Sequence, residues 1–291
     1  MDKFVSDITE GALVADAYSL GAHWIYDPKI LADLAIDWHT LNDPVAQWHA
    51  GKTAGQFTHY GDQLILLYEY ALMNRHFHLG GYMKKWFQFM RRYDGYIDAA
   101  TRNTMDNIRA HNPLPCGFAS EDLSVAGRIG PLMWFSENEN HFIQLADLFT
   151  RSTHYTEVAR ACSEFCARAL WQIRDGVSLP NAFDTAAAAT SPWMVSVLEQ
   201  AKSRVNEPAA ETIQTFGQDC NARHAMPGAL CLALKYQSDY ESAMVANARA
   251  GGDSSARGMV AGMCMTAAFG ADILPGHWRS SISYHPTAQA S

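Results

Sequence analysis

The sequence predicts an all-α protein folded as a compact multi-helix bundle. Apolar residues recur at spacings of three and four along most of the chain, which is the period of one helix face. Alternating β-branched runs bounded by two-residue turns, the usual sign of hairpins, are hard to find. With 291 residues, of which 48% are hydrophobic, the chain has enough apolar surface for a large core. Helices packed on helices satisfy all three observations.

Five segments carry the helical pattern most clearly. Residues 10–17 combine it with small side chains that let neighbouring backbones approach closely. Residues 64–72, 158–169 and 194–201 each place apolar side chains on a single helix face. Residues 258–262 are again rich in glycine and alanine. We expect the first and last of these segments to form the central helices.

No linker, repeat or low-complexity tract divides the chain, so we expect one domain over residues 1–291. Two connections are polar and long for a helical bundle, residues 48–56 and residues 111–117. Each precedes a chemically interesting segment. We therefore expect functional loops to gather at one end of the bundle.

Composition excludes several classes of partner. The formal charge is -8, and the nearest approach to a basic cluster is Lys84-Lys85 with Arg91-Arg92, which is typical of a solvated helix face. We expect no nucleic-acid partner. No apolar run is long enough to span a bilayer, and residues 1–7 lack the features of a secretory signal. These features favour a soluble cytoplasmic protein without a membrane partner.

The six cysteines show no paired spacing, as expected of reduced and mostly buried thiols. Cys162 and Cys166 lie one helical turn apart, which suits core packing better than metal binding because no second Cys/His pair accompanies them. Cys116 lies in a proline-rich loop and is considered as a nucleophile, but no partner histidine is identifiable from the sequence.

Two helix starts carry the main functional signal. Residues 59–63 and residues 251–256 each place an aspartate, Asp62 or Asp253, after glycine at the beginning of an apolar helix. Each aspartate alone is explained as an N-cap worth about 1 kcal/mol. A plain cap explains neither the Gly-Gly pair nor the His-Tyr-Gly lead-in. Alternatively, the two carboxylates converge on a cation such as Mg²⁺, which commonly takes two carboxylates and fills its other positions with water or substrate oxygens.

The chain resembles the ADP-ribosylglycohydrolase family, and within it the branch that includes the J-type crystallins of jellyfish lenses. The match runs nearly end to end and keeps the family's motif order. The matching segments are residues 10–17 (the opening helix), 23–27 (its continuation in the crystallin-like branch), 60–63 (in place of Thr-Asp-Asp-Thr), 124–132 (the Arg-x-x-Pro-Leu segment), 152–154 (Thr-His), 251–256 (in place of Gly-Gly-Asp-Thr-Asp-Thr) and 269–278 (the closing Gly, Ile-Pro and Trp).

The resemblance implies an all-α domain whose metal-dependent members bind two Mg²⁺ ions, which position the ribose of ADP-ribose and assist attack by water on the glycosidic bond. Six side chains bind those ions in such members. At the matching positions this chain keeps only Asp62 and Asp253, whereas the other four positions hold Tyr60, Gly61, Ser255 and Ala256. We therefore expect one Mg²⁺ ion between Asp62 and Asp253, or none.

Site residues are predicted within the matched segments. The catalytic candidates are Asp62, Asp253, Asp16 and His59, because a glycosidase without metal needs an acid and a base or nucleophile facing one sugar. Taken singly, these residues also have simpler explanations. Asp16 is explained by a bond to a neighbouring helix end, and His23 by aromatic core packing. Arg128 is explained by a buried carboxylate partner, and His154 by capping or core packing. The substrate-binding candidates are Tyr60, Gly61, His23, Arg128, Gly252, Ser254 and Ser255.

The predicted function is hydrolysis of a glycosidic bond in an ADP-ribosyl or related nucleoside compound, with a small-molecule or ADP-ribosyl substrate as the partner. The alternative is a non-catalytic protein that keeps the fold and the pocket, as a ligand-binding or structural member of the crystallin-like branch. The missing ligands favour the alternative, and the retained aspartates favour the hydrolase. The sequence leaves the oligomeric state open.

Overall fold

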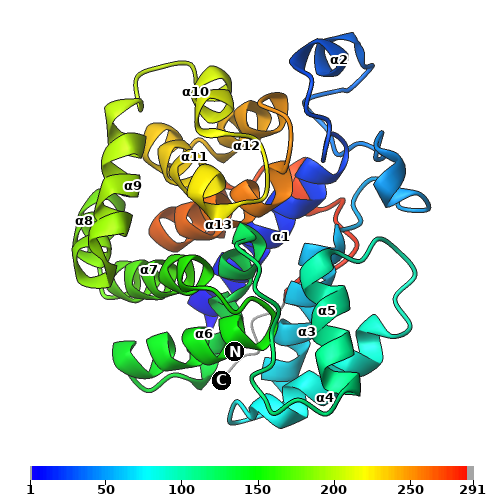
Figure 1. Cartoon of the computed structure of the whole chain (residues 1–291). Coiled ribbons are helices and arrows are strands. Elements are labelled where there is room, and N and C mark those ends of the chain that lie inside the picture. Colours follow the sequence, from blue (N-terminus) through cyan, green and yellow to red (C-terminus); the bar gives the residue numbers. More distant parts are fainter. Residues whose placement is uncertain (1, 287–291) are drawn as a thin grey trace.

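A computed structural model describes residues 2–286 (Figure 1). The first half of the chain forms six α-helices and three short 3₁₀ helices. These are α1 (Lys3–Leu20), α2 (Pro28–Asp33), η1 (Gln47–His49), α3 (His59–Met73), α4 (Leu79–Met90), α5 (Ala99–Arg109), η2 (Leu123–Arg128), η3 (Gly130–Phe135) and α6 (Glu139–Thr153).

Residues 154–286, the described remainder of the chain, form eight α-helices and one 3₁₀ helix. These are α7 (Glu157–Arg174), α8 (Leu179–Thr190), α9 (Pro192–Ser203), α10 (Ala209–Phe216), α11 (Ala222–Tyr236), α12 (Tyr240–Arg249), α13 (Ser254–Phe269), η4 (Ala271–Ile273) and α14 (Gly276–Arg279).

The all-α prediction is confirmed. Between residues 2 and 286 the only extended pairings are three isolated bridges, Ile25 with Gly252, Phe118 with His154, and Asp122 with Asn221. One contiguous hydrophobic cluster runs through the molecule from α1 to α14. No helix in the described part of the chain combines the length and the apolar character that crossing a bilayer requires.

Helices α1 and α13 form the centre of the fold and make its most extensive helix contact (Figure 1). Small residues allow this contact, as the sequence predicted. A Cβ atom at Gly262 would lie 2.6 Å from the carbonyl oxygen of Gly11, and one at Gly11 would lie 2.7 Å from the carbonyl oxygen of Gly262. Helices α7 to α9 flank this pair on one side, and α3 to α5 lie on the other (Figure 1).

The two long loops have different surroundings. The loop over residues 48–56 lies beside the start of α3 and supplies His49 and Lys52 to the polar groups described below. The loop over residues 111–117 packs against the end of α6, because the Gly117 amide donates to the Arg151 carbonyl oxygen. Only the first of them therefore contributes to the candidate site.

Candidate functional site

The two predicted helix starts lie next to each other. Asp253 N-caps α13, where its Oδ1 accepts a hydrogen bond of 2.9 Å from the Ala256 amide. Thr58, rather than Asp62, N-caps α3 through a 3.1 Å bond from the Tyr60 amide to its Oγ1. The same Thr58 Oγ1 lies 3.4 Å from Ser255 Oγ. The cap interpretation of Asp253 is confirmed, and that of Asp62 is wrong.

Asp16, on α1, joins the two helix starts. Its carboxylate accepts from the Thr58 amide at 2.8 Å, from Thr58 Oγ1 at 2.6 Å and from Ser255 Oγ. Burial raises the pKa of Asp16, although these hydrogen bonds oppose the shift. A Cβ atom at Gly61 would lie 2.3 Å from Asp16 Oδ2, so only glycine fits there. Asp16 thus bonds neighbouring helix ends, as the simpler interpretation held.

Asp253 lies at the centre of a second polar group. His23, in the loop after α1, contacts Asp253 Oδ1 through Nε2 at 3.0 Å. Tyr60, from the first turn of α3, donates to Asp253 Oδ2 at 3.1 Å, and the indole nitrogen of Trp24 reaches the same oxygen at 3.4 Å. His23 Nδ1 lies 2.8 Å from Nε2 of His49. His23 and Asp253 are both 0% exposed, and Tyr60 is 1% exposed. Three side chains, those of His23, Trp24 and Tyr60, therefore meet at the buried Asp253 carboxylate, and His49 extends the group through His23.

Asp122, which the sequence analysis missed, completes this group. The Tyr60 hydroxyl lies 3.1 Å from Asp122 Oδ2 as well as 3.1 Å from Asp253 Oδ2. One atom each of Asp122, Asp253 and Cys220 lie within 4.8 Å of one another. Asp122 also caps η2 through the Ser124 amide at 2.8 Å. Its only sequence signal was that cap, two residues before a matched segment.

The two carboxyl groups have separated pKa values. Burial, together with the nearby Asp253 charge, raises the pKa of Asp122 to about 6. Burial also opposes ionisation of Asp253, but attraction to His23 and hydrogen bonds from His23 and the Ala256 amide outweigh it and lower the pKa of Asp253 to about 2. Between these values Asp122 is the acid of the pair and Asp253 is its carboxylate.

Asp62 belongs to a different group. Its Oδ2 accepts from the Lys52 ammonium at 2.6 Å and from the Tyr93 hydroxyl at 2.5 Å. It faces an open cavity of about 510 Å³ lined by Gln88, Phe89, Arg92, Tyr93 and Asp94. Tyr60 and Asp62 are two residues apart on α3, so their side chains project about 200° apart around the helix. The expectation that Asp62 and Asp253 lie together is therefore wrong. Of the two α3 residues, Tyr60 contacts Asp253 and Asp62 does not.

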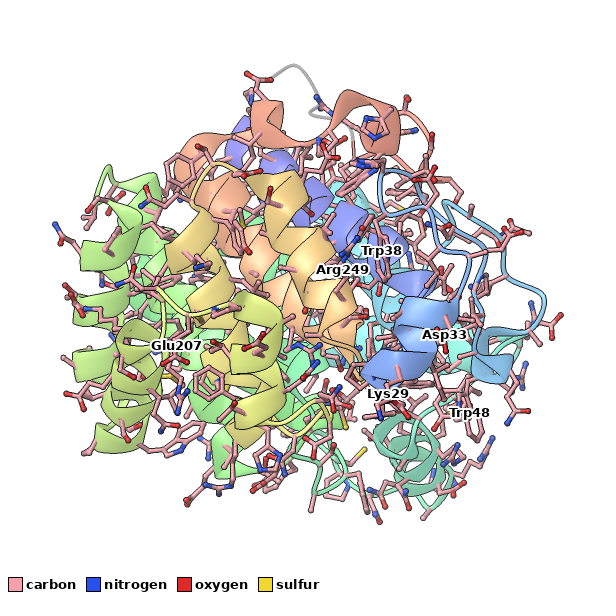
Figure 2. All side chains as sticks on the ribbon, turned by 90° about the horizontal axis from the view of Figure 1, so that it is seen from above. Lys29, Asp33, Trp38, Trp48, Glu207 and Arg249 are labelled. Atoms are coloured by element: carbon pink, nitrogen blue, oxygen red, sulfur yellow. The ribbon has the colours of Figure 1, made fainter. Side chains whose placement is uncertain are left out.

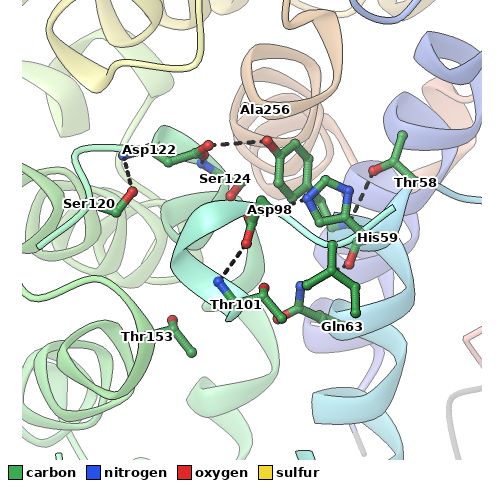
Figure 3. Close-up of polar contacts among 12 residues, drawn as sticks. Thr58, His59, Gln63, Asp98, Thr101, Ser120, Asp122, Ser124, Thr153 and Ala256 are labelled. Atoms are coloured by element: carbon green, nitrogen blue, oxygen red, sulfur yellow. Dashed lines mark hydrogen bonds and ion pairs between the residues drawn. The ribbon is translucent and has the colours of Figure 1, made fainter. Parts of the chain in front are cut away.

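His59 and Arg128 lie deeper in the interior. His59 Nε2 contacts Asp98 Oδ2 at 3.2 Å, and Asp98 caps α5 through the Thr101 amide (Figure 3). Hydrogen bonds and attraction from His59 overcome burial and hold the pKa of Asp98 well below its usual range. Arg128 bonds the Gln63 side-chain oxygen at 2.7 Å instead of the carboxylate that the simpler interpretation expected. Nothing links this group directly to Asp253 among the contacts of the described residues.

The glycine pair before Asp253 has a structural cause. Gly251 and Gly252 have φ angles of 79° and 70°, in the left-handed region that favours glycine. A Cβ atom at Gly252 would lie 2.1 Å from the Gln218 carbonyl oxygen. Gly252 also exchanges backbone hydrogen bonds of 2.8 Å with Trp24 and Ile25. Its predicted substrate-binding role stays a prediction, and so does that of Ser254, whose side-chain hydroxyl is buried without a hydrogen-bond partner among the described residues.

His154 and the three cysteines discussed from the sequence lie in packed, buried surroundings. His154 is buried, as expected, with Nδ1 bonded to Thr153 Oγ1 at 2.9 Å, and burial lowers its pKa to about 3. Cys162 and Cys166 are buried in the core, in line with the packing interpretation. Cys116 is also buried, contrary to its exposed-looking loop, and burial raises the pKa of its thiol.

The residues at the predicted Mg²⁺ site do not fit that ion. Lys52 already supplies a positive charge to Asp62 at 2.6 Å, and Asp62 and Asp253 belong to different polar groups, so they do not offer one ion a pair of carboxylate ligands. Mg²⁺ keeps several waters in an octahedral shell, whereas Asp253 is 0% exposed. We therefore assign no chemical step to Mg²⁺. Its binding stays a prediction.

Comparison with known proteins agrees with the fold. Crystallin J1B of Tripedalia cystophora is 23% identical over 296 residues, covering 93% of this chain and 89% of the crystallin. Crystallin J1A of the same organism is 22% identical over 294 residues, covering 94% and 90%. A solved structure titled "ADP-ribosylglycohydrolase-related protein complex" superposes with a TM-score of 0.68 at 19% identity, over 96% of this chain and 92% of that one.

At these identities the solved structure establishes the fold alone. The family model for ADP-ribosylglycohydrolase matches residues 10–290, which is nearly the whole chain. The motif order described above and this match agree. The chain belongs to the ADP-ribosylglycohydrolase family.

Proposed function

We propose that this protein hydrolyses a glycosidic bond of an ADP-ribosyl or related nucleoside compound, using Asp122 and Asp253 instead of a metal pair. The observation that carries the proposal is the single Tyr60 hydroxyl lying 3.1 Å from both carboxyl groups. A hydroxyl donates one proton and a carboxylate donates none, so the pair is satisfied only when one carboxyl is protonated. Asp122, with its raised pKa, carries that proton.

A neutral acid beside an ionised carboxylate is the arrangement that glycosidases use. Asp122 gives its proton to the leaving atom as the glycosidic bond breaks, and Asp253 Oδ2 attacks the anomeric carbon. This attack forms an ester between the sugar and Asp253. Water then hydrolyses that ester, and the ionised Asp122 takes up a proton from the water. Separation by 4.8 Å or less is nearer to the roughly 5–5.5 Å of retaining enzymes than to the roughly 6.5–9.5 Å of inverting ones. His23 contacts the other oxygen of Asp253, Oδ1, and so fixes the orientation of the carboxylate.

Substrate entry requires the aromatic cover of the pair to move. The half-buried Trp24 stacks on His23 with ring centres 4.4 Å apart and meets Tyr96 at 4.7 Å. Tyr96 in turn meets Trp48, which is 50% exposed and lies near the edge of the molecule in Figure 2. The cover is formed by loop residues, and loops move more readily than helices. The exposed Trp48 ring of this cover offers a nucleoside base a surface on which to stack.

The test measures ADP-ribose release from peptides modified on arginine or serine, in excess chelator. We expect wild type to remain active and Asp122→Asn and Asp253→Asn to lose about 100-fold or more in kcat/KM, since an acid or a nucleophile is removed. Asp106→Asn, on the surface of α5, is the matched control and should leave the rate unchanged. The rate should also fall as pH rises through about 6, where Asp122 loses its proton.

Asp62→Asn separates this route from the cation route. With Asp122 and Asp253 as the reacting groups, the Asp62 variant keeps the rate within about threefold, because Asp62 lies in another group. Loss of activity in chelator, together with equal losses in the Asp62 and Asp253 variants, would instead support the cation predicted from the sequence.

A second candidate function has one specific observation in its favour. His23, Tyr60 and Asp253 are together almost completely shielded from solvent, which suits a group that only stabilises the fold. On this interpretation the protein is a non-catalytic binding or structural member of the family. It predicts no turnover of any of these substrates, together with a loss of stability in Asp253→Asn.

A further inference from the structure

We propose that Asp122, Cys220 and Asp253 form a binding site for a thiophilic divalent cation such as Zn²⁺. One potential ligand atom from each residue lies within 4.8 Å of the other two. Four ligands at the usual zinc bond lengths lie about 3.3–3.8 Å apart, so a contraction of about 1 Å closes the site. The site does not depend on the proposed hydrolysis.

The chain holds the three ligand-bearing segments together through its backbone. The Leu123 amide donates to the Cys220 carbonyl oxygen at 2.9 Å, which fixes the residues after Asp122. The Asp253 amide donates to the Gln218 carbonyl oxygen at 2.7 Å. These bonds connect segments that are far apart in the sequence, so the three side chains are positioned before any ion arrives. A preorganised set of ligands lowers the cost of binding.

A second observation points to a ligand at this place. The Ser124 hydroxyl is 0% exposed and makes no hydrogen bond of normal geometry among the described residues, although it lies near enough to the Asp122 carboxyl group to lower the pKa of Asp122 slightly against the larger effect of burial. It belongs to the residue whose amide bonds Asp122 Oδ1, and it lies beside the Asp122 carboxyl group (Figure 3). A buried hydroxyl without a well-formed hydrogen bond is costly. A cation with its bound water would give this hydroxyl a partner.

The donor set selects the class of ion. One thiolate and two carboxylates suit Zn²⁺ or Co²⁺, whereas Mg²⁺ prefers an all-oxygen octahedral shell. Cys220 is half-buried, so an ion can reach the site from its side. Binding replaces the proton of the Cys220 thiol and the proton that Asp122 shares with Tyr60, so two protons are released for each ion bound. The fourth position is left for water.

The test titrates Co²⁺ into the full-length protein after chelator treatment, without substrate. We expect one equivalent to produce a thiolate-to-cobalt charge-transfer band, which Zn²⁺ abolishes and Mg²⁺ does not. Cys220→Ser should remove the band, and Asp122→Asn should weaken Co²⁺ binding at least tenfold. Cys116→Ser, a cysteine in another loop, should keep the band. Circular dichroism of each variant checks that it is folded.

Two results would overturn the proposal. Either wild type shows no charge-transfer band, or the band persists in a folded Cys220→Ser variant, which would place the ion at another cysteine. If the Cys220→Ser variant does not fold, the Asp122→Asn variant provides the test. Binding of Co²⁺ to that variant as tightly as to wild type would also overturn the proposal. Neither result depends on activity, which is assayed in chelator. The metal site and the hydrolase proposal therefore fail separately.

Discussion

At the scale of single residues, Tyr60 explains most of the difference between this site and the metal-binding site that the resemblance implied. It stands where the metal-dependent members carry a threonine ligand. Its longer side chain carries a hydroxyl across to both Asp122 and Asp253. A shared proton then balances part of the carboxylate charge that a cation would otherwise balance.

The Asp122 carboxyl group should make stability depend on pH. Its folded pKa of about 6 lies above the ordinary value of 3.8, so its contribution is fully present below about pH 3.8 and is lost as pH rises through about 6. Asp122→Asn removes this loss. We expect the stability of wild type relative to Asp122→Asn to fall between pH 4 and pH 7, as measured by urea unfolding.

The informative quantity is the difference in unfolding free energy between wild type and the Asp122→Asn variant at each pH. Burial, together with neighbouring positive groups, lowers the pKa of His49 and of His154 to about 3. Stability therefore also falls as pH drops from about 6.5 towards 3, for a reason unrelated to Asp122. A relative stability that stays constant over pH 4–7 would contradict the assignment of the shared proton.

The sequence located some site residues and not others for a physical reason. Asp16, Tyr60 and Asp253 lie on or at the ends of helices whose apolar period the sequence shows, so their meeting follows once those helices pack. Asp122 and Cys220 lie in loops fixed by long-range backbone bonds, which leave no periodic signal. The prediction for Asp62 failed because Asp62 follows Tyr60 by two residues and therefore lies on nearly the opposite side of α3.

At the scale of elements, the period of apolar residues and the position of small residues predicted the central helices. The expected segments at residues 10–17 and 258–262 lie in α1 and α13, which pack together most closely. The segments at 64–72, 158–169 and 194–201 lie in α3, α7 and α9. Short elements such as η2 and α14 were not predicted, because a single turn shows no period.

The contact between α1 and α13 should not tolerate a larger residue. In Gly262→Ala the new Cβ would lie 2.6 Å from the Gly11 carbonyl oxygen, so the helices must separate. We expect a loss of about 1–3 kcal/mol in the free energy of unfolding, measured by denaturant titration. Gly276→Ala on α14, where nothing lies within 4 Å, is the control. Equal stability of the two variants would contradict the close packing.

At the scale of the whole molecule, Asp16 connects three helices of one continuous core. It lies on α1 and accepts from residues at the starts of α3 and α13. Asp16→Ala leaves buried donors without an acceptor, so we expect a loss of about 2–4 kcal/mol, in one cooperative transition. Calorimetry measures both. The matched variant is Asp27→Ala, which removes an exposed cap from α2 and should cost about 0.5–1 kcal/mol.

Equal effects of Asp16→Ala and Asp27→Ala would show that the three-helix connection contributes little. A loss of hydrolysis in a stable Asp16→Ala protein would instead restore Asp16 to the catalytic role predicted from the sequence. Because Asp16 does not contact Asp253 directly, we expect activity to follow stability in this variant.

The antiparallel bridge between Ile25 and Gly252 has a consequence for the hydrolysis proposed above. The Trp24 segment is fastened by two main-chain bonds to the residue immediately before Asp253. A movement of the Trp24 backbone that admitted a ligand would therefore also move the peptide unit that sets the direction of the Asp253 carboxylate. In the proposed hydrolysis, entry of the ligand and alignment of Asp253 would therefore be coupled, and we expect the closing of this segment, not bond cleavage, to limit turnover.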